Sequence, residues 1–469
     1  MEELNFDVLI IGGGPGGYTS AIRSAQLGLK VGLIEREELG GVCFNWGCIP
    51  TKSLLHAADV MREVESAASL GIELGKPKFN LKKMVKRSRD VAGQLSGGIT
   101  HLMKKNKIDV FFGDARLEDK NTVLVGQQIF NCKNIVLATG ASAKNLPHVQ
   151  ADGDLIWEAR AAMTPSFMPK SLLIIGAGAI GVEFASFYRS MGSDVTLIEM
   201  MEQILPVEDP EIAEMAKSSF TEQGIKVLTE TGIESLQKKK NKLVASINGS
   251  NTTFDAAILS VGVEANIEGL GLDQLGVELQ RGFVSVDEYQ QTSVDGIFAI
   301  GDVCGAPCLA HKASHEGTIC AEVIAGEMPL PLKKDRIPGC TYSYPQVASI
   351  GLTERVASER GPIKVGRFPL LANGKAVAIN DTDGMIKTIF DERTGELLGA
   401  HMIGPGVTEM IQGFAVAMSL ETTQADLMAT VFPHPTLSEA MHESVLDCNW
   451  KIAMEANTEV YHVPSIHPH

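Results

Sequence analysis

The chain is organised around the stretch Gly40-Gly41-Val42-Cys43-Phe44-Asn45-Trp46-Gly47-Cys48-Ile49-Pro50-Thr51-Lys52. Pro50, with apolar residues at helical spacing behind it, predicts a helix that starts there and leaves Cys48 just outside its N-terminus. The partial positive charge at that position favours a thiolate over a thiol. A labile disulfide between Cys43 and Cys48 could therefore pass two electrons. Two buried structural cysteines, or half of a zinc site, are the alternatives that the spacing leaves open.

Length, charge and cysteine content limit the class of protein. A chain of 469 residues is too long for one core, so several domains are expected. Its formal net charge of −16 argues against nucleic acid and anionic membrane as partners. The N-terminus carries no positive segment before an apolar run, and eight cysteines in a chain of this size do not make a disulfide scaffold. These features predict a cytoplasmic protein that neither enters nor spans a membrane.

The N-terminal segment has every part of a dinucleotide-binding unit. In order, these are a strand at residues 6–11, a turn with Gly12, Gly14 and Gly17, a helix at 18–27, and a strand at 30–34 that ends in Glu35. Such glycines let the backbone approach a pyrophosphate at a helix N-terminus, and the acid can accept hydrogen bonds from a ribose. Because strand, glycines, helix and acid agree, a plain tight turn is the weaker interpretation.

A second unit of the same kind follows. Its parts are a strand at 172–175, the turn with Gly176, Gly178 and Gly181, a helix at 182–191, and a strand at 194–198 that leads to Glu199. An acid at this position would repel a ribose 2′-phosphate. The second nucleotide is therefore predicted to be NAD and not NADP.

Two further clusters need a structural explanation. The strand at 295–302 delivers Asp302 to the carboxyl end of a sheet, where ligands bind in α/β folds. Zinc-like spacing follows it, in Cys304, Cys308, His311 and His315. We favour a helix that packs over the turn beside Asp302, with no metal bound. A basic stretch, Lys82, Lys83, Lys86, Arg87 and Arg89, predicts a solvated helix face.

From about residue 337 the pattern changes to strands followed by helices, which predicts an α+β domain. The expected strands are 340–351, 384–390 and 397–403, and the expected helices are 408–420 and 436–447. Two prolines hold His434 in an extended, exposed position, where an imidazole can exchange protons near neutral pH. Glu439 can form a capping box with Thr436, can orient His434, or can do both.

With these motifs in place, the chain resembles the FAD-dependent pyridine nucleotide–disulfide oxidoreductases from end to end. The ending Ile49-Pro50-Thr51-Lys52 favours the dihydrolipoamide dehydrogenase branch over the glutathione branch. The resemblance implies that Cys43 exchanges with substrate while Cys48 contacts the flavin. It also implies that His434 and Glu439 reach the disulfide of the other subunit of a homodimer, and that Lys52 and Glu183 form a charge pair near the flavin.

The resemblance also implies the residues that hold the cofactors FAD and NAD. For FAD these are Gly12, Gly14, Gly17, Glu35, Lys52, Thr139, Gly140, Gly301, Asp302 and Ala310. For NAD they are Gly176, Gly178, Gly181, Glu199 and Gly262. One departure is Val263-Glu264, where many members of the family carry arginines, and this could alter the affinity for NAD.

The predicted fold class is α/β, with two Rossmann-like dinucleotide-binding domains, for FAD and NAD, and a C-terminal α+β dimerisation domain. The expected boundaries are FAD-binding 1–146, NAD-binding 147–265, a second and central part of the FAD-binding domain 266–337, and dimerisation 338–469. The terminal arm after Ala456 is expected to be exposed and is assigned no chemistry.

The predicted function is oxidation of protein-bound dihydrolipoyl groups with reduction of NAD⁺. The expected partners are a second copy of the chain and either lipoylated acyltransferases of 2-oxo acid dehydrogenase complexes or the lipoylated carrier of glycine cleavage. The rival functions are a reductase of glutathione disulfide or mercuric ion and a non-catalytic redox-sensing flavoprotein.

Overall fold

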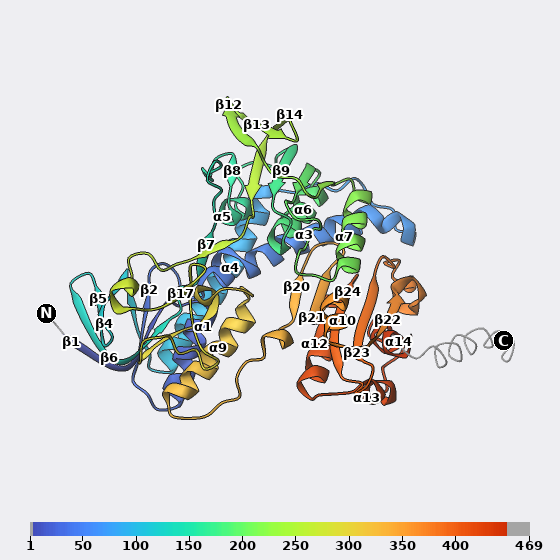
Figure 1. The fold of residues 1–469 in the computed structure, drawn as a ribbon. Helices are drawn as coiled ribbons and strands as arrows, with labels where there is room; N and C mark the ends of the chain where they lie inside the picture. The colour runs from blue at the N-terminus through green and yellow to red at the C-terminus, as the bar shows by residue number, and fades with distance from the viewer. Residues whose placement is uncertain (1–2, 448–469) are drawn as a thin grey trace. The chain divides into compact units, whose positions relative to one another are not determined.

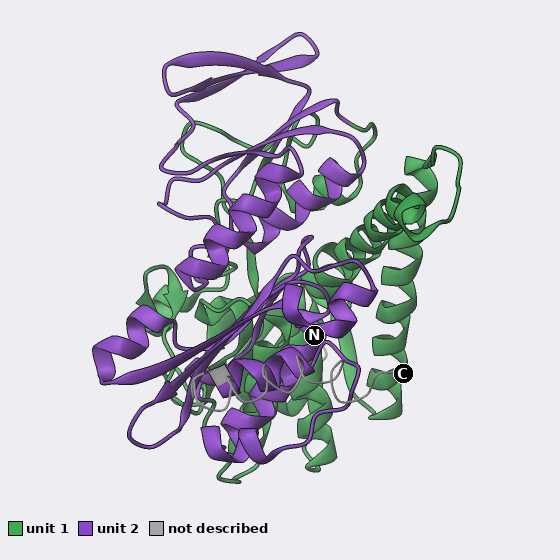
Figure 2. Cartoon of the chain, turned by 90° about the vertical axis from the view of Figure 1, so that its right-hand side faces the viewer, with its two compact units in different colours: residues 1–168, 258–332 green, residues 169–257, 333–469 purple. Residues whose placement is uncertain are grey.

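The computed structural model describes residues 3–447, so the predicted terminal arm lies outside the described residues. The chain divides into two compact units, shown in green and purple in Figure 2. Unit 1 combines residues 1–168 with 258–332, and unit 2 combines residues 169–257 with 333–469. Within the described residues, no helix combines the length and the apolar character needed to cross a membrane.

Unit 1 is built on a sheet with the strand order β3-β2-β1-β6-β5-β4, and β19 also pairs with β6. These strands are β1 (Glu3–Ile11), β2 (Val31–Glu35), β3 (Asp109–Phe112), β4 (Ala115–Asp119), β5 (Thr122–Val125), β6 (Gln128–Leu137) and β19 (Ile297–Ala299). The strands β3, β2, β1, β6 and β19 run parallel. Along β1, Val8 and Ile10 belong to one core and Leu9 and Ile11 to another, so both faces of the sheet are covered.

Helices of unit 1 cover the face of β1 that carries Val8 and Ile10. The helical elements are α1 (Pro15–Gln26), α2 (Gly41–Trp46), α3 (Cys48–Ser66), η1 (Ala67–Leu70), α4 (Leu81–Lys105), α5 (Ala159–Met163), α8 (Leu272–Leu275), η2 (Gly301–Cys304) and α9 (Ala310–Ile324). Helices α1 and α9 approach closely because glycines face each other, and a Cβ on Gly317 would lie 2.5 Å from the carbonyl oxygen of Gly16. Short strands complete the unit: β7 (Ala141–Ala143), β8 (Ile156–Trp157), β16 (Val263–Ala265), β17 (Leu279–Gln280) and β18 (Phe283–Val284).

Unit 2 contains a second dinucleotide-type sheet, with the order β11-β10-β9-β15. Its elements are β9 (Ser171–Ile175), α6 (Ala179–Ser190), β10 (Asp194–Ile198), α7 (Pro210–Glu222), β11 (Lys226–Leu228) and β15 (Ala256–Leu259), which runs on into unit 1. A small antiparallel sheet is formed by β12 (Ser235–Lys239), β13 (Lys242–Ile247) and β14 (Ser250–Phe254).

The C-terminal part of unit 2 is an antiparallel sheet with the order β20-β21-β24-β23-β22 (Figure 1). Its strands are β20 (Gly339–Thr341), β21 (Val347–Gly351), β22 (Ile363–Pro369), β23 (Met385–Asp391) and β24 (Leu397–Ile403). The helical elements are η3 (Lys334–Arg336), α10 (Glu354–Arg360), η4 (Leu370–Ala372), α11 (Gly374–Ala378), α12 (Val407–Ser419), α13 (Gln424–Ala429) and α14 (Glu439–Asp447). Side chains of α12 and α14 share one core with the sheet.

Two boundaries predicted for this part were wrong. The expected strand at 340–351 is two strands, because Pro345 cannot donate to a ladder and interrupts the pairing. The last helix begins at Glu439 instead of residue 436. Two further differences are the strand β22, which was not predicted, and the short helices α10 and α11, which lie between strands. The longer helix α12 and the helices after it follow the last strand as predicted, and the predicted fold class is confirmed.

Candidate redox and dinucleotide sites

The two cysteines of the central stretch lie on consecutive short helical segments of unit 1. Cys43 is in α2, Cys48 is the first residue of α3, and Gly47 between the helices caps α3 with a φ of −152°. The prediction that the helix starts at Pro50 was wrong by two residues. Proline is tolerated throughout a first turn, because the N–H groups there have no partner inside the helix.

The thiols of Cys43 and Cys48 are within hydrogen-bond reach of each other. The pKa of Cys43 is raised above its ordinary value, first by the hydrogen bond with Cys48 and then by burial. Lys52 acts in the opposite direction and Asp302 in the same direction, so both charges lie near the pair. Contact with the second thiol and burial thus both disfavour ionisation of Cys43.

The segment that carries Cys43 packs directly on the first glycine-rich turn. The N–H of Gly40 donates to the carbonyl oxygen of Gly13 at 2.9 Å. A Cβ on Gly41 would lie only 2.6 Å from the Cα of Gly14. This close approach places the thiols beside the loop that the sequence predicted to bind a dinucleotide.

The first glycine-rich turn fits a pyrophosphate. A Cβ on Gly12 would lie 2.2 Å from the carbonyl oxygen of Ala138, and one on Gly17 would lie 1.8 Å from that of Gly12. No side chain caps the N-terminus of α1, which leaves its N–H groups available to an anion. Glu35 accepts hydrogen bonds from the N–H groups of Gly13 at 2.6 Å and of Glu37 at 2.7 Å, so its carboxylate is fixed at the end of β2.

Further predicted contacts of the same cofactor lie after β6 and β19. The hydroxyl of Thr139 is buried and has no hydrogen-bond partner among the described residues, which marks a place for a polar ligand. Gly140 follows it with a φ of +71°, and its carbonyl accepts from the N–H of Asn266. Burial raises the pKa of Asp302 above its ordinary value, against the opposing charge of Lys312. An orphaned hydroxyl and a desolvated carboxyl group fit the polar chain of a flavin cofactor.

A buried ion pair on α9 holds the turn that carries Asp302, and sequence reasoning missed it. The ammonium of Lys312 donates to the carbonyl oxygens of Gly301 and Gly305, both at 3.1 Å, and lies 3.3 Å from Glu316. Glu316 in turn accepts from the N–H of Gly301 at 2.7 Å. The side chains of Lys312 and Glu316 are only 2% and 3% exposed. Their i,i+4 spacing was the available signal, but such pairs normally lie on a solvated helix face.

The zinc-like cluster does not form a metal site within the part of the chain that the structure describes. His311 and His315 are exposed on α9, as the helical interpretation expected. Cys304 ends η2, and Cys308 lies in the loop before α9. Ala310, a predicted flavin contact, is the first residue of α9.

The second glycine-rich turn, in unit 2, repeats the geometry of the first. Gly12 and Gly176 have φ values of +108° and +98°, and they donate their N–H groups to the carbonyl oxygens of Ile34 and Ile198, in each case the residue before the acid. The N–H of Ala177 donates to Glu199 at 2.7 Å, and that of Met201 donates to the same carboxylate at 3.0 Å. A Cβ on Gly178 would meet no atom within 4 Å, so this turn is open to a ligand.

His434 presents an exposed and oriented imidazole. Its Nδ1 lies 2.8 Å from a carboxylate oxygen of Glu439, and its side chain is 78% exposed. The other oxygen of Glu439 accepts from the N–H of Thr436 at 2.8 Å, which is one half of a capping box. The hydroxyl of Thr436 donates to Pro433 instead. Glu439 thus contacts the imidazole of His434, whereas only the backbone bond of the expected capping box forms.

The two residues of the predicted charge pair belong to different helices. Lys52 is in α3 of unit 1, and Glu183 is in α6 of unit 2, where its carboxylate accepts from the N–H of Tyr342 at 2.9 Å. Their charge pair therefore stays a prediction. Gly262 has a φ of +107°, and the exposed Glu264 follows it in β16.

Two family models together match most of the chain. Residues 6–317 match the family described as pyridine nucleotide-disulphide oxidoreductase, and residues 337–445 match its dimerisation domain. The chain belongs to the pyridine nucleotide-disulphide oxidoreductases. A short match to the ring hydroxylating alpha subunit (catalytic domain) covers residues 426–469, much of which lies outside the described residues.

Relatives from several bacteria carry one name. The dihydrolipoyl dehydrogenase of Zymomonas mobilis is 52% identical, over 94% of this chain and 97% of the relative. That of Rhizobium etli is 49% identical, over 96% of this chain and 99% of the relative. These relatives confirm the predicted family branch, and with it the use of FAD and NAD by an oxidoreductase.

Solved structures agree with the fold over the same extent. LpdA from Mycobacterium tuberculosis is 26% identical with a TM-score of 0.88, covering 94% of this chain and 99% of that one. The HOCl-induced flavoprotein disulfide reductase RclA from Escherichia coli is 27% identical with a TM-score of 0.84, covering 94% and 99%.

Proposed function

We propose that the chain is the dihydrolipoyl-oxidising enzyme of a lipoyl-dependent complex and that Cys43 and Cys48 form its redox-active disulfide. The observation that carries this proposal is the thiol pair packed against the first glycine-rich turn, with Lys52 and Asp302 beside it. The names of the relatives supply the substrate class.

In the proposed reaction a thiolate of the dihydrolipoyl group attacks the sulfur of Cys43. The Cys43–Cys48 bond breaks, and Cys48 leaves as a thiolate. The second lipoyl sulfur then displaces Cys43, which closes the lipoyl disulfide and leaves the protein with two more electrons. FAD held at the first glycine-rich turn would supply a two-electron carrier between this dithiol and NAD⁺, and the overall reaction would convert dihydrolipoyl plus NAD⁺ to lipoyl, NADH and one proton.

His434 is proposed as the base that removes the thiol proton of the substrate. Its ring is exposed, and Glu439 fixes the tautomer in which Nδ1 carries the proton, leaving Nε2 to accept one. His434 lies within the matched dimerisation domain, which supports action on the disulfide of a partner subunit.

The proposed acceptor is NAD⁺ and not NADP⁺. Both oxygens of Glu199 are held by backbone N–H groups at the end of β10, so the negative charge cannot swing away from a ribose 2′-phosphate. This argues against an NADPH-dependent reductase of glutathione disulfide or mercuric ion. Reduction of the purified protein by NADH and by NADPH, compared at equal concentration, tests the preference.

The proposed partners are a second copy of the chain and a lipoylated protein, either an acyltransferase of a 2-oxo acid dehydrogenase complex or the carrier of glycine cleavage. The proposed compartment is the cytoplasm, where a reducing environment keeps buried thiols such as Cys132 and Cys320 reduced. Capture of this chain by purified lipoylated domains of each kind would distinguish the complexes.

The test is the rate of dihydrolipoamide oxidation in His434→Gln. We expect a loss of about 100-fold or more, as for a positioned general base, with the flavin still bound. His101→Gln is the control, because this histidine is exposed on α4. A loss within about threefold would contradict the role of His434.

A further inference from the structure

Trp46 lies between the two cysteines and is held by two arginines from other parts of unit 1. The guanidinium carbon of Arg89, on α4, is 3.7 Å from the centroid of the indole ring. That of Arg160, on α5, is 4.0 Å from the same centroid. Two planar guanidinium groups at these distances would overlap on one face, so they lie on opposite faces of the ring.

Each arginine is itself anchored. Arg89 also donates a hydrogen bond to the carbonyl oxygen of Asn45, the residue before Trp46. Arg160 forms an ion pair with Glu37 at 3.0 Å. Arg89 was predicted to lie on a solvated helix face, and this prediction was wrong. Arg89 is half-buried against the indole, whereas the other basic residues of that stretch are exposed: Lys82, Lys83, Lys86 and Arg87.

The two positive charges of the stack formed by Arg89, Trp46 and Arg160 are balanced by nearby acidic residues. Burial lowers the pKa of Arg89, with Glu38 opposing the shift and Arg160 adding to it. Glu37 and Glu38 thus offset the two cations. The indole nitrogen of Trp46 is buried without a hydrogen-bond partner among the described residues, so stacking is what fixes the ring.

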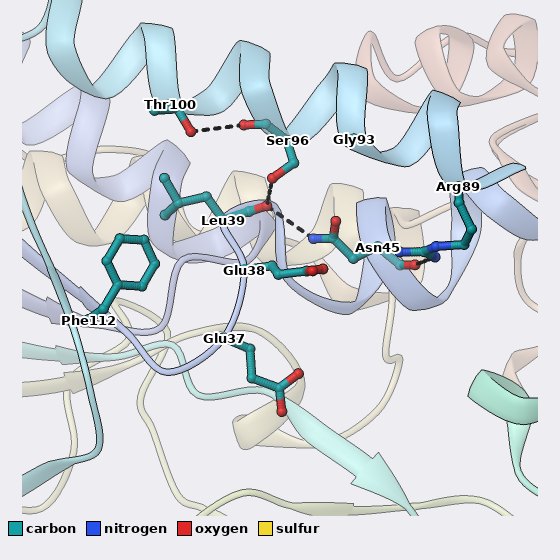
Figure 3. Close-up of a pocket in the computed structure, with 9 residues that line it drawn as sticks. All are labelled: Glu37, Glu38, Leu39, Asn45, Arg89, Gly93, Ser96, Thr100 and Phe112. Carbon is teal, nitrogen blue, oxygen red and sulfur yellow. Dashed lines mark hydrogen bonds between the residues drawn. The ribbon is translucent and has the colours of Figure 1, made fainter. Parts of the chain in front are cut away.

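Other hydrogen bonds hold residues 39–41, which precede Cys43, and Figure 3 shows those that reach Leu39. The side-chain amide of Asn45 donates to the carbonyl oxygens of Leu39 and Gly41, at 3.0 and 3.1 Å. The hydroxyl of Ser96, on α4, donates to the same Leu39 carbonyl at 2.7 Å. These bonds hold the residues before Cys43, and the stack holds those between Cys43 and Cys48.

We propose that Arg89 and Arg160 are positioning residues for the Cys43–Cys48 couple and that they act through Trp46. The inference rests on the proposed redox role of the two cysteines. When the disulfide opens, Cys43 must turn toward substrate while Cys48 stays at the flavin. Because the indole of Trp46 is stacked on both faces, residues 44–47 between the two cysteines stay in place when Cys43 moves. Stacking needs the flat guanidinium, so lysine should not replace arginine here.

The test compares two reactions of the same holoenzyme. Dihydrolipoamide oxidation needs the thiols, whereas NADH oxidation by ferricyanide draws electrons from the flavin and bypasses them. In Trp46→Leu, Arg89→Met and Arg160→Met we expect kcat for dihydrolipoamide to fall by about 10- to 100-fold with KM within about threefold. The ferricyanide reaction should stay at the wild-type rate. Arg89→Lys should behave like Arg89→Met, and Trp46→Phe should recover most of the rate.

A second readout is spectroscopic. Anaerobic reduction by NADH should give a long-wavelength absorbance from a Cys48 thiolate against the flavin, and this band should be weaker or shifted in the stack variants. Arg87→Met is the matched control: it removes a guanidinium from the same helix, where Arg87 donates to Ser53. It should leave both reactions and the band unchanged.

The outcomes separate this inference from the proposed function. If Cys43→Ser kept dihydrolipoamide oxidation, the proposed function would fail. If Cys43→Ser abolished it while the stack variants kept wild-type kcat and band, only the positioning role would be overturned. An equal loss of both reactions in the stack variants would also overturn it, because it would indicate general damage to the flavin domain.

Discussion

Replacing Lys312 with Met should destabilise the flavin domain and loosen its hold on the cofactor. The side chain is 2% exposed and keeps three polar contacts: Glu316, Gly301 and Gly305. Met has a similar length, so the variant removes the charge and the donors without leaving a large cavity. The turn from Gly301 to Gly305 would lose its clamp, and Asp302 lies within that turn.

The loss in the free energy of unfolding can be worked out from the buried groups that lose their partner. Removing one partner of a buried ion pair costs about 3–5 kcal/mol, because the other charge stays buried. Two carbonyl oxygens also lose their donor, at about 1 kcal/mol each. We therefore expect the free energy of unfolding to fall by roughly 5–7 kcal/mol, a large share of a typical domain's stability. Part of this loss should appear as faster release of flavin, since a bound ligand stabilises the folded state.

Urea unfolding and the rate of flavin release, both followed by flavin fluorescence, measure the two effects. Adding Glu316→Gln to Lys312→Met should restore part of the stability, because the unpaired charge is removed while an oxygen that can accept from Gly301 remains. Lys82→Met, an exposed lysine on α4, is the control. The reasoning is refuted if Lys312→Met unfolds within about 1 kcal/mol of wild type and keeps its flavin.

Three further changes have clear expected outcomes. Gly17→Ala would put a Cβ 1.8 Å from the carbonyl oxygen of Gly12, so we expect loss of bound flavin in the absorbance spectrum, with native circular dichroism showing whether the fold survives. Burial raises the pKa of Glu208 to about 7 from an ordinary value of 4.5. The unfolded chain therefore releases this proton at lower pH than the folded protein does, so the free energy of unfolding falls as pH rises from 4.5 to 7. In Glu208→Gln this fall should be smaller by about 3 kcal/mol, as measured by urea unfolding at the two pH values. Lys387→Met would remove the buried cation that lies 2.8 Å from Asp209 and from Glu211, and thermal unfolding should show a loss of about 3–5 kcal/mol.

The sequence was sufficient to predict structure where all the residues of a motif are contiguous along the chain. The two glycine-rich turns could be predicted because strand, glycines, helix and acid are contiguous, and the observed bonds of Glu35 and Glu199 close each unit on itself. Helix starts were harder to predict. Cys48 opens α3 although Pro50 offered the stronger signal, because any residue of a first turn can be proline.

The amino-acid sequence by itself determined the family, the two dinucleotide units, the spacing of the cysteines, and an exposed histidine between prolines. Only the tertiary structure decided that Arg89 packs on a face of the Trp46 ring. It also decided that Lys312 and Glu316 are buried beside the turn of Asp302. The physical reason is that a charged side chain is placed by partners distant in sequence. Arg89 finds its partner 43 positions away, at Trp46, and no local pattern on its own helix encodes that contact.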